Sequence, residues 1–439
     1  MPSNHRPRQL VAAALTAGLV LALAACAQEY PNSTFNHNTE FNTDIDFLWD
    51  RLLFWGTVVF VLVEVALIYT IVKFRHREGA PAPRQVHGNT RLEIMWTVAP
   101  ALILVFIAVP TVRTIFRTQA PAAPDALQVE VIGHQWWWEF HYPEYGIRTA
   151  NELYLPIGRT VNFALRTQDV IHSFWIPQLG GKRDLISNRT NYVWFTPDST
   201  MESSAWNGFC AEFCGVSHAN MKFRTFTVQP AEFERWVAHQ QSPAAFGAVA
   251  PAAPATAPAT SPAAVPAAGA GQGGAGDPAQ GQAVELAVAA DSAAPASAGE
   301  PYWFPVEQLP EHILPQLQPP ASVTVNESLV GDPQRGMEIY SRSSCIGCHA
   351  INGNPMSISR IGPDLTHVGS RHTIAAGMFT NNTRNLMAWI KNSRALKPGS
   401  IMPTIGKGER DPVTGQVIDM GGLDDQQIAD IVAYLQALK

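Results

Sequence analysis

The chain contains little cysteine and little charge. Among its 439 residues there are five cysteines, and Lys and Arg total 30 against 36 for Asp and Glu. The net charge of -6 leaves no basic excess of the kind that nucleic acids attract, so nucleic-acid binding is not expected. Charge almost disappears between residues 241 and 300, where Ala, Pro, Gly and Ser dominate. That composition excludes a packed domain and predicts a linker.

Two of the five cysteines lie in the run from Cys210 to Met221, together with His218. Thiolate, thioether and imidazole are soft or borderline ligands that favour copper, and a thioether argues against zinc. A mononuclear blue-copper site needs one cysteine, whereas Cys210 and Cys214 can bridge two coppers if another histidine joins them. His172 is the leading candidate for that histidine. A disulfide between the two cysteines is the alternative, and it would leave His218 and Met221 without a role.

This run closely resembles the dinuclear CuA centre of cytochrome c oxidase subunit II. The resemblance implies these copper ligands: His172, Cys210, Cys214, His218, Met221 and the main-chain carbonyl of Glu212. It also implies that the Glu212 side chain binds a Mg or Mn ion shared with subunit I. In the aromatic run from His134 to Phe140, it makes Trp136 the electron entry next to copper. Core packing or contact with the membrane interface is expected of Trp137 or Trp138.

The segment Cys345-Ile-Gly-Cys348-His349 is the attachment signature of c-type haem, in which both thiols form thioethers and His349 binds the iron. A free Cys-x-x-Cys redox pair is the competing interpretation. By resemblance to small cytochromes c, Met402 is the distal iron ligand and the Pro363 carbonyl accepts the hydrogen bond from His349 Nδ1. Histidine and methionine ligation raises the haem potential, which suits an electron donor to copper. The competing thioethers, expected to serve apolar packing, are Met356, Met378, Met387 and Met420.

The fifth cysteine, Cys26, follows an Arg-bearing start and the apolar run from Leu10 to Leu23. This pattern is typical of a bacterial lipoprotein signal, in which Cys26 becomes the lipidated N-terminus. Ordinary signal cleavage and an uncleaved anchor are the alternatives.

Two further apolar stretches, Leu52 to Val72 and Ile94 to Val112, are each long enough to span a membrane. The connection between them carries several Lys and Arg residues, so the positive-inside rule places it in the cytoplasm and both flanks on the outer face. We therefore expect a protein of the bacterial inner membrane whose copper and haem domains lie in the periplasm.

Two acidic residues accompany these spans. Glu64 lies at mid-span, where we expect a hydrogen bond to a neighbouring subunit, with a role in a proton path as the alternative. Glu93, in Leu92-Glu93-Ile-Met-Trp96, begins the second span. This segment resembles the subunit II motif whose Glu lies at the mouth of a proton channel into subunit I. The alternative for Glu93 is an acid placed favourably at a helix N-terminus.

The predicted fold class is a multidomain membrane protein: a two-helix transmembrane hairpin, an all-β cupredoxin-like sandwich, a disordered Ala/Pro linker and an all-α class I cytochrome c domain. The predicted parts are signal peptide 1–25, periplasmic N-terminal segment 26–46, hairpin 47–118, CuA domain 125–240, linker 241–325 and cytochrome c domain 326–439. Strands are expected at 127–132, 161–165 and 192–195, with the copper run in a loop between the last strands. If coil-like, a linker of roughly 60 residues would reach about 45 Å and let the haem domain visit its own copper site.

The whole arrangement resembles subunit II of a caa-type cytochrome c oxidase. The resemblance implies that electrons from cytochrome c or an upstream cytochrome complex pass through haem c and CuA to subunit I, which works with other oxidase subunits. Oxygen reduction to water, coupled to proton translocation, would belong to that complex, because this chain has no recognisable oxygen-reducing site. One alternative is the electron-input subunit of a CuA-containing nitric oxide reductase. The other is a membrane-anchored copper and haem carrier, against which the hairpin argues.

Overall fold

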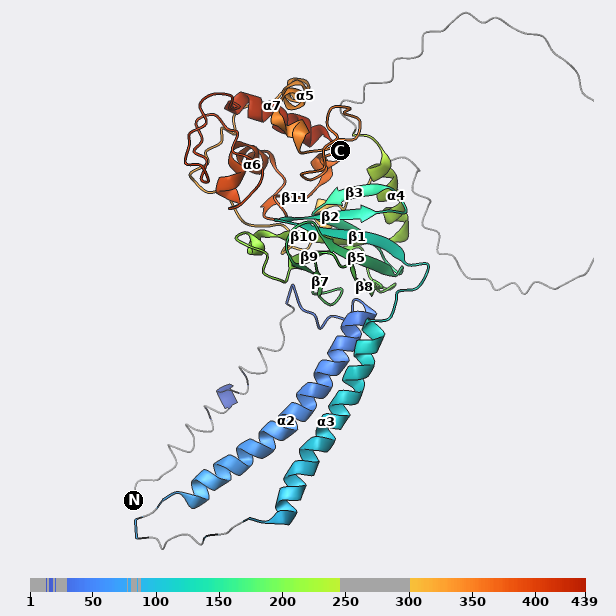
Figure 1. Ribbon diagram of the computed structural model, residues 1–439, viewed down its shortest axis with the longest axis vertical. Helices are drawn as coiled ribbons and strands as arrows, with labels where there is room; N and C mark the ends of the chain where they lie inside the picture. Colours follow the sequence, from blue (N-terminus) through green and yellow to red (C-terminus); the bar gives the residue numbers. More distant parts are fainter. Residues whose placement is uncertain are drawn as a thin grey trace, which may run out of the picture.

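The computed structural model describes residues 30–76, 88–244 and 301–439, together with a few isolated residues before 30 and between 77 and 88. Figure 1 shows three parts in sequence order: two long helices, a β-sandwich at one end of them, and a helical domain on the far side of the sandwich. The predicted fold class is confirmed in all three parts. Cys26 and residues 245–300 of the predicted linker lie outside the described residues.

Helices α2 (Glu40–Phe74) and α3 (Thr90–Thr118) run side by side (Figure 1). Both are apolar and long enough to cross a membrane, as the sequence predicts. Helix α2 begins twelve residues before the predicted apolar stretch, because Thr39 caps it against the sandwich. The Thr39 hydroxyl accepts from the Asn42 amide at 3.3 Å and donates to the Leu179 carbonyl at 2.6 Å. The outer end of the hairpin is thereby fixed to the sandwich.

The sandwich consists of two five-stranded sheets, ordered β3-β2-β1-β5-β8 and β4-β10-β9-β6-β7. Its elements are β1 (Leu127–His134), β2 (Trp137–Tyr142), β3 (Ile147–Ala150), β4 (Glu152–Pro156), β5 (Val161–Thr167), β6 (His172–Trp175), β7 (Arg183–Leu185), β8 (Asn191–Phe195), β9 (Ser204–Cys210), η1 (His218–Asn220), β10 (Lys222–Val228) and α4 (Pro230–Gln241). Burial alternates along strand β1, as expected for a strand with one buried face. Leu127, Val129 and Val131 are fully buried. The three predicted strands are present.

The segment 301–325 differs from the predicted linker, because it packs on the sandwich. Phe304 and Ile313 are fully buried in the sandwich core, and the Phe304 ring lies 5.3 Å from the ring of Phe226. The Phe304 amide donates to the Tyr154 hydroxyl at 3.1 Å. Burial of these apolar side chains holds the segment in place. It includes η2 (Val306–Gln308) and leads directly into the helical domain.

The helical domain contains α5 (Pro333–Arg342), η3 (Ser344–Gly347), η4 (Val368–Ser370), β11 (Thr373–Ile374), β12 (Phe379–Thr380), α6 (Thr383–Leu396) and α7 (Asp425–Ala437). The small β11–β12 pair is an addition to the predicted all-α domain. Helices α5 and α7 approach closely at Gly336, where a Cβ atom would lie 2.0 Å from the Asp430 carbonyl oxygen. Asp424 caps α7 by accepting from the Gln427 amide at 2.9 Å.

The helical domain is docked directly on the sandwich (Figure 1). The Glu152 carboxylate in β4 accepts from the His372 amide at 2.7 Å. The Arg224 guanidinium in β10 donates to the Gly377 carbonyl at 3.2 Å. Glu152, His372 and Arg224 are all buried. The haem domain is therefore docked on the sandwich, the domain that carries the copper site it was expected to visit; the flexible tether itself stays a prediction.

Candidate copper centre and haem pocket

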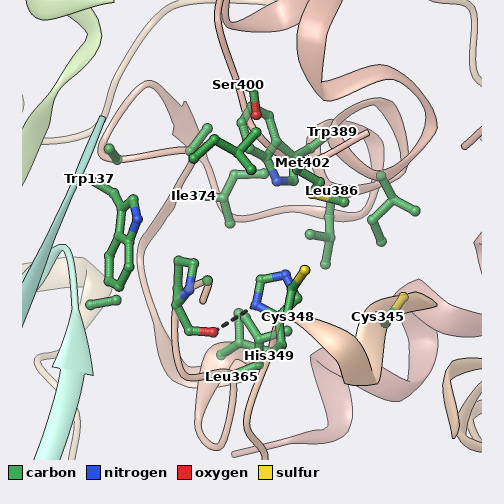
Figure 2. A pocket seen from close by; sticks show the side chains of 18 of the residues that line it. Trp137, Cys345, Cys348, His349, Leu365, Ile374, Leu386, Trp389, Ser400 and Met402 are labelled. Carbon is green, nitrogen blue, oxygen red and sulfur yellow. Dashed lines mark hydrogen bonds between the residues drawn. The ribbon is translucent and has the colours of Figure 1, made fainter. Parts of the chain in front are cut away.

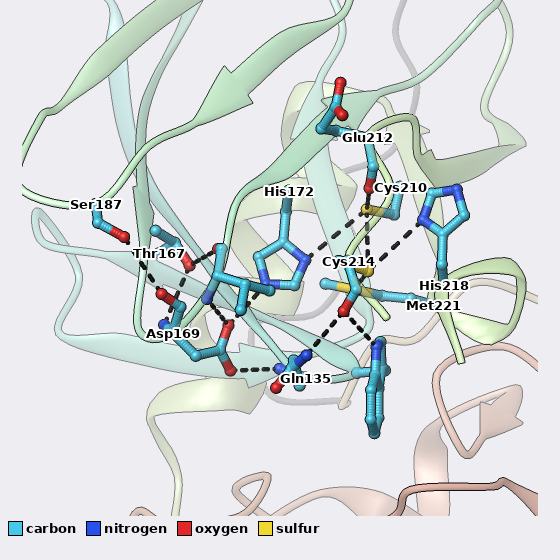
Figure 3. Close-up of polar contacts among 12 residues, drawn as sticks. Gln135, Thr167, Asp169, His172, Ser187, Cys210, Glu212, Cys214, His218 and Met221 are labelled. Atoms are coloured by element: carbon cyan, nitrogen blue, oxygen red, sulfur yellow. Dashed lines mark hydrogen bonds and ion pairs between the residues drawn. The ribbon is translucent and has the colours of Figure 1, made fainter. Parts of the chain in front are cut away.

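The predicted copper ligands converge at one end of the sandwich (Figure 3). Strand β9 ends at Cys210, and the loop that follows carries Cys214 and His218 before β10 begins. Strand β6 pairs with β9, which brings His172 beside Cys210. The sulfur atoms of Cys210 and Cys214 lie 3.8 Å apart. Nδ1 of His172 lies 3.8 Å from Cys210 Sγ, and Nδ1 of His218 lies 3.6 Å from Cys214 Sγ.

Met221 and Glu212 complete the cluster. The thioether sulfur of Met221 lies 3.9 Å from Cys214 Sγ, and the Glu212 carbonyl lies 3.2 Å from Cys210 Sγ. Both cysteines are free thiols, so the alternative of a disulfide is not what the structure adopts. All six predicted ligand groups therefore surround one small volume. This donor set fits copper.

The two thiols titrate as a pair. Their mutual hydrogen bond lowers the pKa of Cys210 far below the ordinary value and raises the pKa of Cys214 far above it. Two thiolates this close repel each other, so the second proton leaves only when positive charge is supplied nearby. A metal cation would supply that charge, as binding by two thiolates requires.

Asp169 fixes the orientation of His172. Its carboxylate accepts from His172 Nε2 at 2.8 Å, which leaves His172 Nδ1 directed at Cys210 (Figure 3). Asp169 also accepts from the Gln135 amide at 2.6 Å. Partial burial opposes ionisation of Asp169, but its hydrogen bonds from His172 and the main chain outweigh burial and lower its pKa. A carboxylate on the far nitrogen is the usual means of orienting a metal-binding imidazole.

The Glu212 side chain is exposed, and its carboxylate lies apart from the two cysteine sulfurs in Figure 3. Among the described residues, the one group of three or more His, Cys, Asp or Glu side chains able to hold a metal is His172, Cys210 and Cys214. Binding of a Mg or Mn ion by the Glu212 side chain stays a prediction.

The predicted haem ligands line one apolar pocket in the helical domain (Figure 2). His349 Nδ1 donates to the Pro363 carbonyl at 2.7 Å, as the sequence predicts. Burial lowers the pKa of His349, so the imidazole stays neutral with Nε2 available as a ligand. Cys345, Cys348 and Met402 line the same pocket. A pocket with two thiols, a neutral imidazole and a thioether on its walls fits covalent haem c.

The other methionines do not line this pocket. Met378 and Met387 are buried in the core of the helical domain, whereas Met356 and Met420 are exposed on its surface. Met402, whose own carbonyl accepts from Ser393 at 2.7 Å, is the one methionine among the pocket-lining residues. The placement supports the sequence assignment of Met402.

The three consecutive tryptophans have three different surroundings. Trp136 donates its indole N–H to the Cys214 carbonyl at 3.0 Å, next to the copper ligands. Trp137 stacks on His134, with ring centroids 4.1 Å apart, and faces the haem pocket (Figure 2). Trp138 is fully buried in the sandwich core, which is the packing expected of Trp137 or Trp138. Trp136 also lines the haem pocket, so it lies between the two candidate sites.

Glu93 lies in the first turn of α3, where its carboxylate accepts from the Asn89 amide at 3.3 Å. This contact fits the alternative of an acid at a helix N-terminus, and it leaves the carboxylate exposed. Glu64 lies within α2 and is half-buried.

Sequence reasoning missed the residues that join the two sites. Lys397 is buried at the boundary and donates to the Trp136 carbonyl at 2.6 Å. The Ser217 hydroxyl donates to the Pro398 carbonyl at 2.5 Å, and Gly399 packs on the Trp136 ring. The run that begins at Lys397 is visible in the sequence as part of the cytochrome motif. Its contacts with the sandwich leave no recognisable sequence pattern, because the acceptors are main-chain carbonyls, which every residue type has.

The fold and the two sites define a membrane-anchored protein that joins a copper-binding sandwich to a cytochrome c domain. Residues 14–114 match the family described as cytochrome c oxidase subunit II, transmembrane domain, and residues 146–228 match its periplasmic domain. Residues 333–439 match cytochrome c. The cytochrome c match implies haem c, and the periplasmic-domain match implies copper.

Similar curated proteins cover most of the chain. It is 29% identical over 402 residues to cytochrome c oxidase subunit 2 of Alkalihalophilus pseudofirmus, covering 89% of this chain and 87% of the relative. It is 30% identical over 353 residues to the Bacillus subtilis protein of that name, covering 77% and 76%. Quinol oxidase subunit 2 of Bacillus spizizenii is 35% identical over 202 residues, covering 44% and 62%. The chain belongs to the cytochrome c oxidase subunit 2 family and is a subunit of a haem-copper oxidase complex, in the form with a fused cytochrome c domain.

Proposed function

We propose that this chain is the electron-input subunit of an aerobic respiratory oxidase. It accepts electrons through covalent haem c and a dinuclear CuA centre and passes them to subunit I, where oxygen is reduced to water with proton translocation. Haem c is held by Cys345, Cys348, His349 and Met402, and its His349 ligand is oriented by the Pro363 carbonyl. When bound, two coppers bridged by both thiolates would share one electron with little change in geometry. Their ligands are His172, Cys210, Cys214, His218, Met221 and the Glu212 carbonyl.

The position of Trp136 carries this proposal. Its indole N–H contacts the carbonyl of the copper ligand Cys214 at 3.0 Å. On the other side its ring packs against Gly399, where an added Cβ atom would lie 2.4 Å from Cζ3. Gly399 precedes the haem ligand Met402 by three residues. One side chain therefore touches both the copper-ligand loop and the loop that carries a haem ligand.

The docked haem domain also determines where an external donor binds. Trp136 is 9% exposed beneath that domain. A soluble cytochrome c or an upstream cytochrome complex therefore delivers its electron to the haem domain, and Trp136 serves as the entry from this chain's own haem into the copper site. In family members without a fused haem domain the same residue would be open to an external partner.

The remaining sites are assigned from the export-signal pattern and from resemblance to the family. The sandwich and the haem domain lie on the periplasmic face of a bacterial inner membrane, and Cys26 carries the lipid anchor. The exposed Glu212 carboxylate contributes to a Mg or Mn ion whose other ligands come from subunit I. Glu93 lies at the mouth of a proton channel into subunit I. We expect Glu93→Gln to slow proton uptake by the complex and to leave the copper absorption unchanged; normal uptake would remove the assignment.

The competing functions differ in the terminal acceptor. An electron-input subunit of a nitric oxide reductase would use the same copper and haem modules, and a carrier would have no large partner. The test is oxygen uptake by the native membrane complex purified through this subunit, with an artificial donor that reduces haem c. Cyanide-sensitive uptake is the expected result. A complex with full copper and haem that reduces nitric oxide but not oxygen would replace this proposal, as would the absence of any co-purified partner.

A further inference from the structure

Two histidines from different domains meet in a buried contact, away from the copper centre and the haem ligands. His239 lies near the end of α4 in the copper domain, and His367 lies just before η4 in the haem domain. Their ring centroids are 4.4 Å apart with the rings tilted at 57°. The residues are 5% and 3% exposed. Neither ring is among the predicted copper or haem ligands.

Each ring has one nitrogen committed to a main-chain carbonyl. His239 Nδ1 donates to the Tyr302 carbonyl at 3.2 Å, and His367 Nε2 donates to the Ser242 carbonyl at 3.2 Å. Because a carbonyl oxygen only accepts, these two nitrogens carry the hydrogen atoms. In the neutral rings, His239 Nε2 and His367 Nδ1 are then lone pairs. Both are buried, and neither has a hydrogen-bond partner among the described residues.

At neutral pH these two nitrogen atoms are not protonated. Burial lowers the pKa of His239, and burial together with the neighbouring His239 lowers the pKa of His367 to about 4. The charge of Arg371 also opposes protonation of His367. The Lys439 ammonium is directed elsewhere, 6.0 Å from the centre of the Trp303 ring. Two neutral imidazoles with buried, unpartnered lone pairs, each fixed by a carbonyl on its far nitrogen, have the form in which histidine binds metals.

A main-chain group of Lys439 also acts to raise the pKa of each histidine, without outweighing burial. We propose that His239 Nε2 and His367 Nδ1 bind a divalent transition-metal ion of the zinc class. Imidazole with oxygen suits such borderline ions, and water would complete the coordination. The ion would tie α4 of the copper domain to the haem domain and so hold the docked position.

The test uses the full chain loaded with copper and haem c. Zinc chloride is titrated in a calorimeter, and zinc X-ray absorption reports the number of imidazole ligands. We expect one zinc ion with two imidazole ligands, and a loss of affinity of at least about tenfold in both His239→Gln and His367→Gln. His312→Gln, at an exposed histidine, is the matched control and should bind zinc as the parent does.

Two results would overturn the site. One is zinc binding of unchanged affinity in His367→Gln whose copper and haem absorption is intact. The other is the absence of a two-imidazole zinc in the parent chain, a result that needs no variant and therefore does not depend on whether a substitution folds. Neither result bears on the electron route, because the readouts are stoichiometry, affinity and ligand number.

Discussion

The ammonium nitrogen of Lys397 lies 2.6 Å from the carbonyl oxygen of Trp136, across the boundary between the haem domain and the copper domain. It also donates to the Ala375 carbonyl at 3.1 Å. Lys397 is 4% exposed, and burial lowers its pKa to about 7. A buried amine between two carbonyls has few alternative positions, so it fixes the haem-domain loop on Trp136.

Replacement of Lys397 should loosen this contact. Lys397→Met keeps the apolar stem but removes both hydrogen bonds, which leaves two buried carbonyls unpaired at a cost of about 1–3 kcal/mol each. We expect slower electron transfer from photoreduced haem c to copper, measured by flash photolysis on the full chain. Lys407→Met, at an exposed lysine of the same domain, is the control. Equal rates in Lys397→Met and in the parent would show that this contact does not position the loop.

Alanine variants at two glycines distinguish a steric clash with Trp136 from backbone strain alone. Gly399 and Gly408 have φ of +84° and +82°, so alanine strains both backbones alike. At Gly399 the new Cβ would lie 2.4 Å from the Trp136 ring, whereas at Gly408 it meets nothing within 4 Å. We expect Gly399→Ala to slow transfer between haem c and copper roughly tenfold or more, because the loop must move off the ring. Gly408→Ala should transfer at the parental rate. Parental transfer in both variants would place the electron path elsewhere.

Docking should depend on pH through His372. Burial alone would lower the pKa of His372, but the Glu152 carboxylate, with oxygen 3.5 Å from Nδ1, outweighs it and raises the pKa above 6.5. A raised histidine pKa contributes stability that is complete below pH 6.5 and is lost as the pH rises through the folded-state value.

The measurement is the thermal stability of the docked chain between pH 5 and pH 9, compared with His372→Gln. We expect the parent to exceed the variant most at low pH, with the difference shrinking above pH 6.5. The comparison removes the contribution of His239 and His367, whose lowered pKa values act in the opposite direction. A constant difference across the range would contradict a charged His372.

Met402 should set the haem potential. Met402→Ala removes the thioether from the pocket, and loss of methionine ligation lowers the potential and opens the iron to external ligands. Redox titration of the haem band, with and without carbon monoxide, measures both effects. Met420→Ala, at a residue 95% exposed, is the control. An unchanged midpoint potential of the haem in Met402→Ala would show that another residue is the distal ligand.

The sequence predicts the ligands of both sites because ligand chemistry is local in the chain. Cys210, Cys214 and His218 share one loop, and the haem signature is a single pentapeptide. His172 is a candidate from the sequence alone, but its approach to Cys210 depends on the pairing of β6 with β9, which the local sequence does not show. The strands followed from alternation, as in β1, where every second residue is buried.

The docked position of the haem domain was not predictable from the sequence. Its contacts join residues more than 150 positions apart, such as Glu152 with the His372 amide and Lys397 with the Trp136 carbonyl. Main-chain groups supply most of the partners, and every residue type carries them. The predicted linker includes the segment 301–325, yet Phe304 and Ile313 bury enough apolar surface to fix this segment to the sandwich.

The most direct measurement is the rate at which copper is reduced after haem c is photoreduced in the full chain, followed at several protein and salt concentrations. The docked arrangement around Trp136 requires a first-order rate that is independent of protein concentration and nearly independent of salt. A rate proportional to protein concentration, or haem c that stays reduced while copper remains oxidised, would contradict electron transfer within the docked chain.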